Sequence, residues 1–264
     1  MSPINKESEE YIRNLEEKIV ELSLKLKQKN NQLISASKEN QKVLGKLTHN
    51  LKNPIGVISS FSEMMLEDLE DYTPEKLTKY LGAINNSAKF SLNFLTSISK
   101  YTQVKSSEFE LNLEKVNLIE LIENLVAKLA EKADDKNITI LKNYNKKELF
   151  LNIDASEMGV ALYNVLDNAI RYSFENTTIT ITIIENNDKI EVVCLDEGIG
   201  ISDDNLPHIF EPFFVVNTYD NEKNKCIGLG LTVAKMIVEK HSGILNVKSK
   251  LNQGSEFRIS YKKT

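Results

Sequence analysis

The sequence lacks the residues that mark several common classes of protein. Among its 264 residues it has no tryptophan, and Cys194 and Cys226 are its only cysteines. Two such cysteines form neither a disulfide framework nor a Cys-x-x-Cys metal motif, which favours a reducing compartment. No uncharged apolar run approaches the ~20 residues of a membrane-spanning helix, and the stretch MSPINKESEE does not resemble a signal peptide. We therefore expect a cytoplasmic segment that makes no membrane contact of its own.

The sequence also lacks an excess of basic residues. Its formal net charge is −5 at pH 7, and its pI is about 5.5. Because lysine and arginine are spread along the chain, we expect no electrostatic binding of nucleic acid or anionic lipid. With 41% hydrophobic residues, the chain is able to form a sizeable core in one or two domains. Small molecules or other proteins are the expected partners.

Apolar residues recur at alternating steps of three and four between Tyr11 and Leu47, which indicates a heptad repeat. Asn40 falls at an a position, where a buried Asn sets the register of two-stranded coils. We predict a parallel dimeric coiled coil over residues 1–43. Because Lys29 and Asn40 weaken the seam, the alternative is an amphipathic helix that packs on its own domain. The seam residues are Ile12, Leu15, Ile19, Leu22, Leu26, Leu33, Ala36, Val43 and Leu47.

One of the three histidines, His49, lies in the stretch KLTHNLKNPIG. The heptad register puts it at position c, toward solvent, so burial between two helices does not explain it. Pro54 cannot donate the helical hydrogen bond to the carbonyl of Asn50, so the helix should bend or loosen just after the histidine. Taken alone, a single histidine on a helix is most often a packed or solvated bystander.

A second amphipathic helix should follow, with Thr73 as its N-cap and Pro74 at its first position. The two helices would form a hairpin over residues 44–106, and two hairpins of a dimer would form a four-helix bundle. From residue 107 to residue 264, mixed helix and strand patterns predict an α/β sandwich. We expect helices over residues 118–137, 156–173 and 231–241, strands over 138–144 and 148–154, and hairpins over 177–198 and 243–263.

Polar side chains repeat on one face of the helix expected over residues 156–173. Asn164, Asn168 and Arg171 are spaced i, i+4 and i+7. Neutral amide oxygens suit a Mg²⁺ ion that already carries phosphate oxygens and water, and arginine binds phosphate directly. Taken alone the pattern is weak, because surface helices often carry two asparagines.

Glycine-rich stretches follow at two places. The strand ending in CLDEGIGIS carries Asp196, whose carboxylate suits an adenine amino group, and Gly198 and Gly200, which either admit the ring or form a turn with positive φ. Gly228 and Gly230 precede a helix, where free amides and the helix dipole favour phosphate. The segment between them, IFEPFFVVNTYDNEKNK, is too long and polar for a simple connection and predicts a mobile lid over a ligand.

In this order the motifs resemble the catalytic core of sensor histidine kinases of two-component systems. THNLKNP resembles their H box, NVLDNAIRYS the N box, DEGIGI the first glycine box, IFEPFF the F box and GLGL the second glycine box. The match extends from about Leu44 to Tyr261 and is highly specific. The resemblance implies a dimeric bundle that carries the histidine, a Bergerat-type ATP domain, and in some relatives a sensor or membrane domain upstream.

The resemblance also implies roles for single residues. His49 would take the γ-phosphoryl group of ATP and pass it to an aspartate of a response regulator docked on the hairpin. Asn168 would ligate Mg²⁺, Asp196 would read adenine, and Tyr172 would lie near the nucleotide. The other residues that the resemblance assigns to the nucleotide site are Asn164, Arg171, Gly198, Gly200, Phe210, Gly228, Leu229 and Gly230.

The sequence departs from the family pattern at two positions. Cys226 replaces a common glycine beside the lid, and Asn50 stands where the family usually has the Glu or Asp that helps to deprotonate the histidine. Asn53 matches the residue that orients water for dephosphorylating the regulator. A phosphatase-biased protein and an ATP-binding dimeric scaffold therefore remain as alternatives. Hydrolysis is disfavoured, because the related ATPases carry a glutamate where this chain has Asn164.

Overall fold

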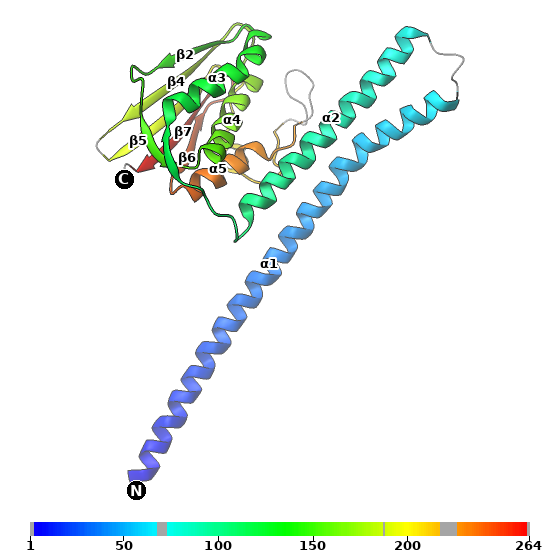
Figure 1. Ribbon diagram of the computed structural model, residues 1–264. Coiled ribbons are helices and arrows are strands. Elements are labelled where there is room, and N and C mark those ends of the chain that lie inside the picture. The colour runs from blue at the N-terminus through cyan, green and yellow to red at the C-terminus, as the bar shows by residue number, and fades with distance from the viewer. Residues whose placement is uncertain (1–2, 68–72, 187, 217–225, 263–264) are drawn as a thin grey trace.

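The computed structural model describes the chain except for residues 1–2, 68–72, 187, 217–225 and 263–264. Two long helices form an extended hairpin in the N-terminal part, and a sheet covered by helices forms the rest (Figure 1). The predicted fold class, a helical part followed by an α/β domain, is confirmed. Most of the predicted lid lies outside the described residues.

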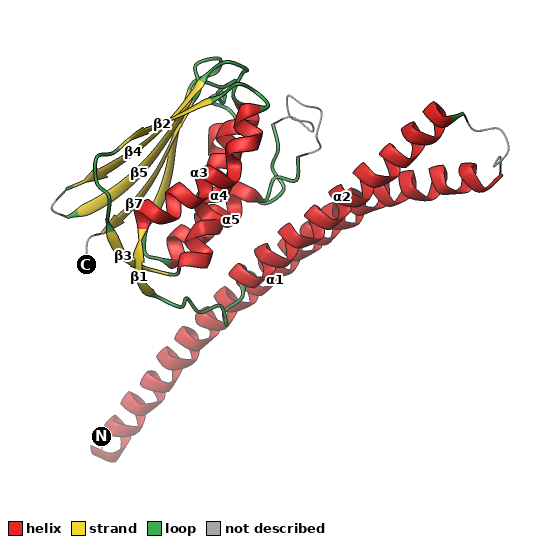
Figure 2. Cartoon of the chain, turned by 45° about the horizontal axis from the view of Figure 1, so that its top comes forward, coloured by secondary structure: helices red, strands yellow, loops and turns green. Residues whose placement is uncertain are grey.

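The first helix, α1, extends from Pro3 to Glu67 without interruption, although Pro54 lies inside it. The helix bends toward its C-terminal end rather than breaking (Figure 2). Leu26 and Leu33 of the predicted heptad seam are 72% and 69% exposed. Leu22 is also exposed, whereas Val43 and Leu47 are partly buried. The side chains of Ile12, Leu15, Ile19, Ala36 and Asn40 lie outside the described part of the structure. The coiled-coil dimer stays a prediction.

The second helix, α2 (Pro74–Lys105), begins where the sequence predicts. The side chain of Thr73 accepts a hydrogen bond from the amide of Lys76 at 3.3 Å. Pro74 occupies the first turn, where an amide hydrogen would have no helical acceptor. α2 runs back along α1 (Figure 1), and the ring centroids of Phe61 and Tyr80 lie 4.8 Å apart.

The α/β domain is built on a five-stranded sheet in the order β2-β4-β5-β7-β6. β2 is parallel to β4, and the other neighbours are antiparallel. β1 pairs separately with β3, and three helices cover one face of the large sheet (Figure 2). The helices are α3 (Leu118–Asp134), α4 (Ala155–Tyr172) and α5 (Gly230–Lys240), and the strands are β1 (Glu114–Asn117), β2 (Thr139–Asn143), β3 (Phe150–Ile153), β4 (Thr178–Glu185), β5 (Lys189–Asp196), β6 (Ile244–Ser249) and β7 (Ser255–Lys262).

The core lies between the sheet and these helices. Alternate residues of the strands, such as Ile181 of β4 and Phe257 of β7, are at most 2% exposed. The apolar side of α4 packs in the same core, with Leu162 and Val165 buried. Because the apolar side of α4 faces the core, the polar residues on its other side lie at the margin of the domain.

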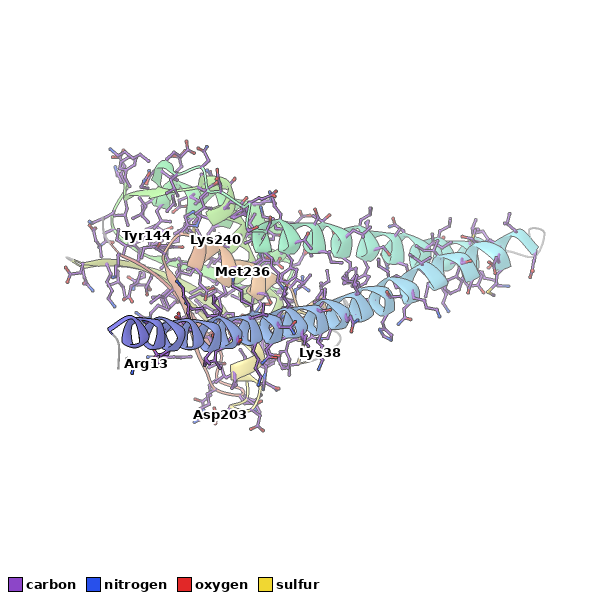
Figure 3. The ribbon with its side chains drawn as sticks, turned by 90° about the horizontal axis from the view of Figure 1, so that it is seen from below. Arg13, Lys38, Tyr144, Asp203, Met236 and Lys240 are labelled. Atoms are coloured by element: carbon purple, nitrogen blue, oxygen red, sulfur yellow. The ribbon has the colours of Figure 1, made fainter. Side chains whose placement is uncertain are left out.

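The hairpin contacts the domain along α2. Phe94 and Tyr101 are buried, and their ring centroids lie 6.5 and 6.3 Å from that of Phe213. Lys100 Nζ lies 2.6 Å from Glu157 Oε1 of α4. Nearer the end of α2, an open cavity lies between α2 and α5, at the side of α5 where Figure 3 labels Met236 and Lys240. It is lined by Val104, Lys105, Met236, Glu239 and Lys240.

Candidate active site

Asp196 ends β5 with a carboxylate that is only 4% exposed. Its Oδ1 atom accepts hydrogen bonds from the amides of Gly198 at 2.9 Å and Ser255 at 3.1 Å. Burial raises the pKa of this carboxyl to about 6, although the two hydrogen bonds act in the opposite direction. Both bonds go to Oδ1, so Oδ2 is the oxygen that remains for the amino group of a ligand.

The glycines after Asp196 allow close approaches of the backbone. A Cβ atom at Gly198 would lie 2.4 Å from the carbonyl oxygen of Tyr172, the last residue of α4. At Gly200, with φ of +64°, a Cβ atom would lie 2.0 Å from the carbonyl oxygen of Lys250. The amide of Ile199 donates to the carbonyl of Tyr172 at 3.1 Å. The first glycine motif is thus fixed to the end of α4. Gly200 forms a turn with positive φ, one of the two explanations that the sequence offered for this glycine.

The second glycine motif brings the start of α5 against α4. A Cβ atom at Gly230 would lie 3.1 Å from Asn164 Oδ1. Gly228 has a φ of +72°, and its carbonyl accepts the amide of Phe213 at 2.8 Å. The side chain of Leu229 is 1% exposed and belongs to the core, so only its backbone is available to a ligand. The N-terminal amides of α5 lack a side-chain cap, which fits the binding of phosphate.

The predicted site residues of α4 lie at its margin. Asn164 and Asn168 are half-buried, and the guanidinium of Arg171 lies 3.3 Å from Asp167. Lys132 of α3 binds the same carboxylate at 2.5 Å, so Asp167 is shared by two cations. The pair of Asp167 and Arg171 has i,i+4 spacing, so the sequence alone could have indicated it.

Two aromatic residues connect the site to the F motif and the lid. The hydroxyl of Tyr172 lies 3.2 Å from Cys226 Sγ, so the residue that follows the lid segment contacts the end of α4. Phe210 is half-buried, and Lys235 Nζ of α5 lies 5.0 Å from its ring centroid. The N, F and glycine motifs are therefore neighbours in the structure.

The donor set fits a metal ion that arrives with a nucleotide. Among the residues that the structure describes, no three His, Cys, Asp or Glu residues form a group able to hold a metal. An amide oxygen such as that of Asn168 is a suitable ligand only when phosphate oxygens and water complete the shell. Within the same described part, the hydroxyl groups of Ser173 and Thr232 are buried and have no hydrogen-bond partner. Ser173 pairs through its backbone with Gly198, so its hydroxyl group lies beside the first glycine motif.

The histidine and its neighbours lie on α1. His49 and Asn53 are exposed, and Asn50 is half-buried. One turn earlier, Lys46 Nζ donates to the carbonyl of Pro212 at 3.4 Å and lies 5.8 Å from the ring centroid of Phe213. The described contacts thus join this helix to the F motif through Lys46 rather than through His49.

Two residues near Asp196 escaped the sequence analysis. Ser255 supplies one of the two amides on its carboxylate, 59 positions away in the sequence. Gly254 has a φ of +84°, and a Cβ atom there would lie 1.9 Å from the carbonyl oxygen of Asp196. The Gly-Ser pair at the start of the last strand was the feature of the sequence that could have pointed to them. The local pattern does not predict that this strand pairs with β5, which ends at Asp196.

The fold and these motifs define a nucleotide-binding domain of a known class. Residues 153–264 match the family model described as histidine kinase-, DNA gyrase B-, and HSP90-like ATPase. No helix in the described parts of the chain is both long and apolar enough to cross a membrane.

Similar proteins narrow this class. The chain is 27% identical over 220 residues to the sensor protein SrrB of Staphylococcus aureus, which covers 83% of this chain and 37% of that protein. It is 27% identical to histidine kinase ThkA, solved in complex with response regulator protein TrrA, with a TM-score of 0.69 over 84% of this chain and 61% of that one. Acinetobacter baumannii histidine kinase AdeS shares the fold at 19% identity and a TM-score of 0.62, over 81% of this chain and 97% of that one.

By these matches residues 153–264 carry the ATPase domain that the family model describes, and the chain is similar to the catalytic cores of sensor histidine kinases. The chain spans little more than a third of the length of the curated relatives it matches.

Proposed function

We propose that the protein is an ATP-dependent protein-histidine kinase that phosphorylates His49 and passes the phosphoryl group to an aspartate of a response regulator. The observation that carries this proposal is the meeting of the N, F and glycine motifs around α4 and the start of α5. We assign residues 1–43 to a signalling coiled coil, 44–106 to dimerisation and phosphotransfer, and 107–264 to ATP binding.

In the proposed site each residue has a physical task. Asp196 accepts a hydrogen bond from the adenine amino group, and the amides from Gly228 to Gly230 bind phosphate oxygens. Asn164 and Arg171 add polar contacts near the phosphates, while Tyr172 and Phe210 border the nucleotide. When bound, Mg²⁺ neutralises phosphate charge, and Asn168 is its protein ligand.

The reaction forms one bond and breaks another. A ring nitrogen of neutral His49 attacks the γ-phosphorus of ATP, and ADP leaves with the electron pair of the broken phosphorus–oxygen bond. The imidazole loses its proton to solvent water at the same stage. Asn50 is able to orient the ring but not to take that proton, so the reaction is slow. The exposed position of His49 supports a transfer that requires the ATP domain to move toward it.

Two partners belong to the proposal. A homodimer would cover the exposed apolar residues of α1, such as Leu26 and Leu33. Light scattering should then give twice the 30.0 kDa mass of the chain. A response regulator would dock on the hairpin near His49, which the similarity to ThkA, solved with its regulator, supports.

Asn50 and Asn53 favour a second candidate function, that of a protein biased toward dephosphorylating its regulator. Incubation with ATP labelled at the γ-phosphate tests the two. The kinase should acquire acid-labile, alkali-stable label, as phosphohistidine does, and should transfer it to a receiver domain. A protein that takes up no label but accelerates loss of label from a phosphorylated receiver is instead a phosphatase. ATP binding without either activity would leave only a scaffold.

A further inference from the structure

Lys136 is a buried cation that the proposed function does not use. The residue comes two positions after the end of α3 and is only 6% exposed. Its Nζ atom donates to the carbonyl of Ile170 at 3.1 Å and to that of Arg171 at 2.7 Å. Both carbonyls belong to the last turn of α4, which lies beside α3 on the same face of the sheet (Figure 2). A lysine buried in this way must be held by its partners, because an unpaired buried charge is costly.

The last carbonyls of an α-helix have no helical partner. In α4 the carbonyl of Ala169 still accepts the amide of the C-cap residue Ser173 at 3.0 Å, and that of Tyr172 accepts the amide of Ile199 at 3.1 Å. Lys136 Nζ bonds the two carbonyls between them, those of Ile170 and Arg171. Its positive charge also lies at the negative end of the helix dipole, which strengthens the contact.

The same residue holds the chain that leaves the helix. The carbonyl of Lys136 accepts the amide of Asn176 at 3.0 Å. Lys136 therefore contacts the chain at Arg171 and at Asn176. Ser173 lies between these two residues, and its backbone pairs with that of Gly198. Gly198 in turn donates its amide to the carboxylate of Asp196. A short path of hydrogen bonds therefore connects Lys136 to the residue proposed to read adenine.

We propose that Lys136 is a positioning residue for the nucleotide site, which fixes the end of α4 against the first glycine motif before the ligand binds. This inference rests on the proposed function, since it assumes that Asp196 binds adenine. It predicts that loss of the ammonium group weakens the adenine end of the site rather than the phosphate end.

The test compares Lys136→Met, which keeps the length of the side chain, with Lys136→Arg, which keeps the cation. Lys142→Met is the control, because Lys142 makes only an exposed ion pair with Glu123 in the same domain. Dissociation constants for Mg·ADP and for adenosine are measured by calorimetry and by competition, at a temperature where circular dichroism shows each variant to be fully folded.

Lys136→Met should weaken ADP and adenosine binding by the same factor, about tenfold, the order expected when hydrogen bonds to a charged group are lost. Lys136→Arg should restore most of the affinity, and Lys142→Met should bind like the parent protein. A purely structural role would lower the melting temperature and leave both dissociation constants unchanged. Weakening of ADP alone would indicate a distant charge effect on phosphate, and would also overturn the proposal.

A measurement on the parent protein covers the case in which Lys136→Met does not fold. The amides of Ser173 and Ile199 should exchange slowly with deuterium before any nucleotide is added. Fast exchange that becomes slow only with ADP would show that the turn is not preformed, against the proposal. If the parent binds no ADP at all, the proposed function falls and this role with it. If the parent binds and Lys136→Met binds equally well, only the role of Lys136 falls.

Discussion

The hairpin and the α/β domain differ in how their apolar side chains are covered. In the domain, Ile181 and Phe257 are at most 2% exposed, whereas Leu33 of α1 and Leu92 of α2 are 69% and 65% exposed. The domain buries its core within one chain. The hairpin leaves an apolar face that only another surface can cover. The α/β domain therefore has a core of its own, whereas the hairpin has exposed apolar residues that the proposed homodimer would cover.

The largest expected effect comes from the core of the domain. Phe257→Ala removes a side chain that is 2% exposed between the sheet and the helices. It should lower the free energy of unfolding by about 3–5 kcal/mol, measured by urea denaturation followed by circular dichroism. Phe174→Ala, at a side chain 47% exposed, is the matched control and should change it by less than about 0.5 kcal/mol. Equal effects of the two would contradict the contrast between core and surface.

The next effect concerns pH. The carboxyl of Asp196 has its pKa raised to about 6 from 3.8, so the folded state binds the proton more tightly than the unfolded state. Its ionisation should therefore reduce stability as pH rises from about 4 to about 6, by up to about 3 kcal/mol. Asp196→Asn lacks this dependence, so its stability relative to the parent should increase over that range. If the melting temperatures of the parent and of Asp196→Asn change with pH in parallel, burial does not raise the pKa of this carboxyl.

A smaller effect is expected at the histidine. Asn50→Glu and Asn50→Asp restore a group that is able to accept the proton of His49. The initial rate of autophosphorylation should rise about tenfold or more, since general-base assistance contributes about 10² to 10⁴ in rate. ATP affinity should not change, because Asn50 lies on α1 and not in the ATP domain. If neither acidic variant is faster than the parent, another base takes the proton and the missing-base explanation is wrong.

The smallest effect is expected at the start of α2. Thr73→Ala removes the oxygen that accepts the amide of Lys76. It should cost about 1 kcal/mol of stability, whereas Thr73→Ser should cost much less because it keeps the hydroxyl. Thermal unfolding of both variants measures the difference. A loss as large for Ser as for Ala would mean that the methyl group, and not the cap, stabilises the helix.

Local pattern predicted much of the molecule. The cap at Thr73 needed only its neighbours in sequence, and the helix expected over residues 156–173 differs from α4 by one residue at each end. Distant contacts could not be read in this way. α3 was expected to continue to residue 137, but it ends at Asp134, Asn137 takes a φ of +52°, and Lys136 reaches across to α4.

The same limit applies to the candidate site. The motifs gave Asp196 and its glycines, but the amide of Ser255 comes from a strand whose pairing is set by the whole sheet. The strand β1 was not predicted either, because its four residues gain their partners only from β3. Pro54 was expected to bend or loosen α1, and the helix continues through it and bends toward its C-terminal end (Figure 2), since one missing hydrogen bond is tolerated within a long helix.

The most direct test of the account separates ATP binding from phosphorylation in two variants. His49→Gln should bind ATP with the affinity of the parent by calorimetry and take up no label from the γ-phosphate. Asp196→Asn should bind ATP far more weakly and also remain unlabelled at ATP concentrations that saturate the parent. This pattern would place ATP binding in the α/β domain and the phosphoacceptor on α1. Label on His49→Gln, or unchanged ATP affinity in Asp196→Asn, would contradict it.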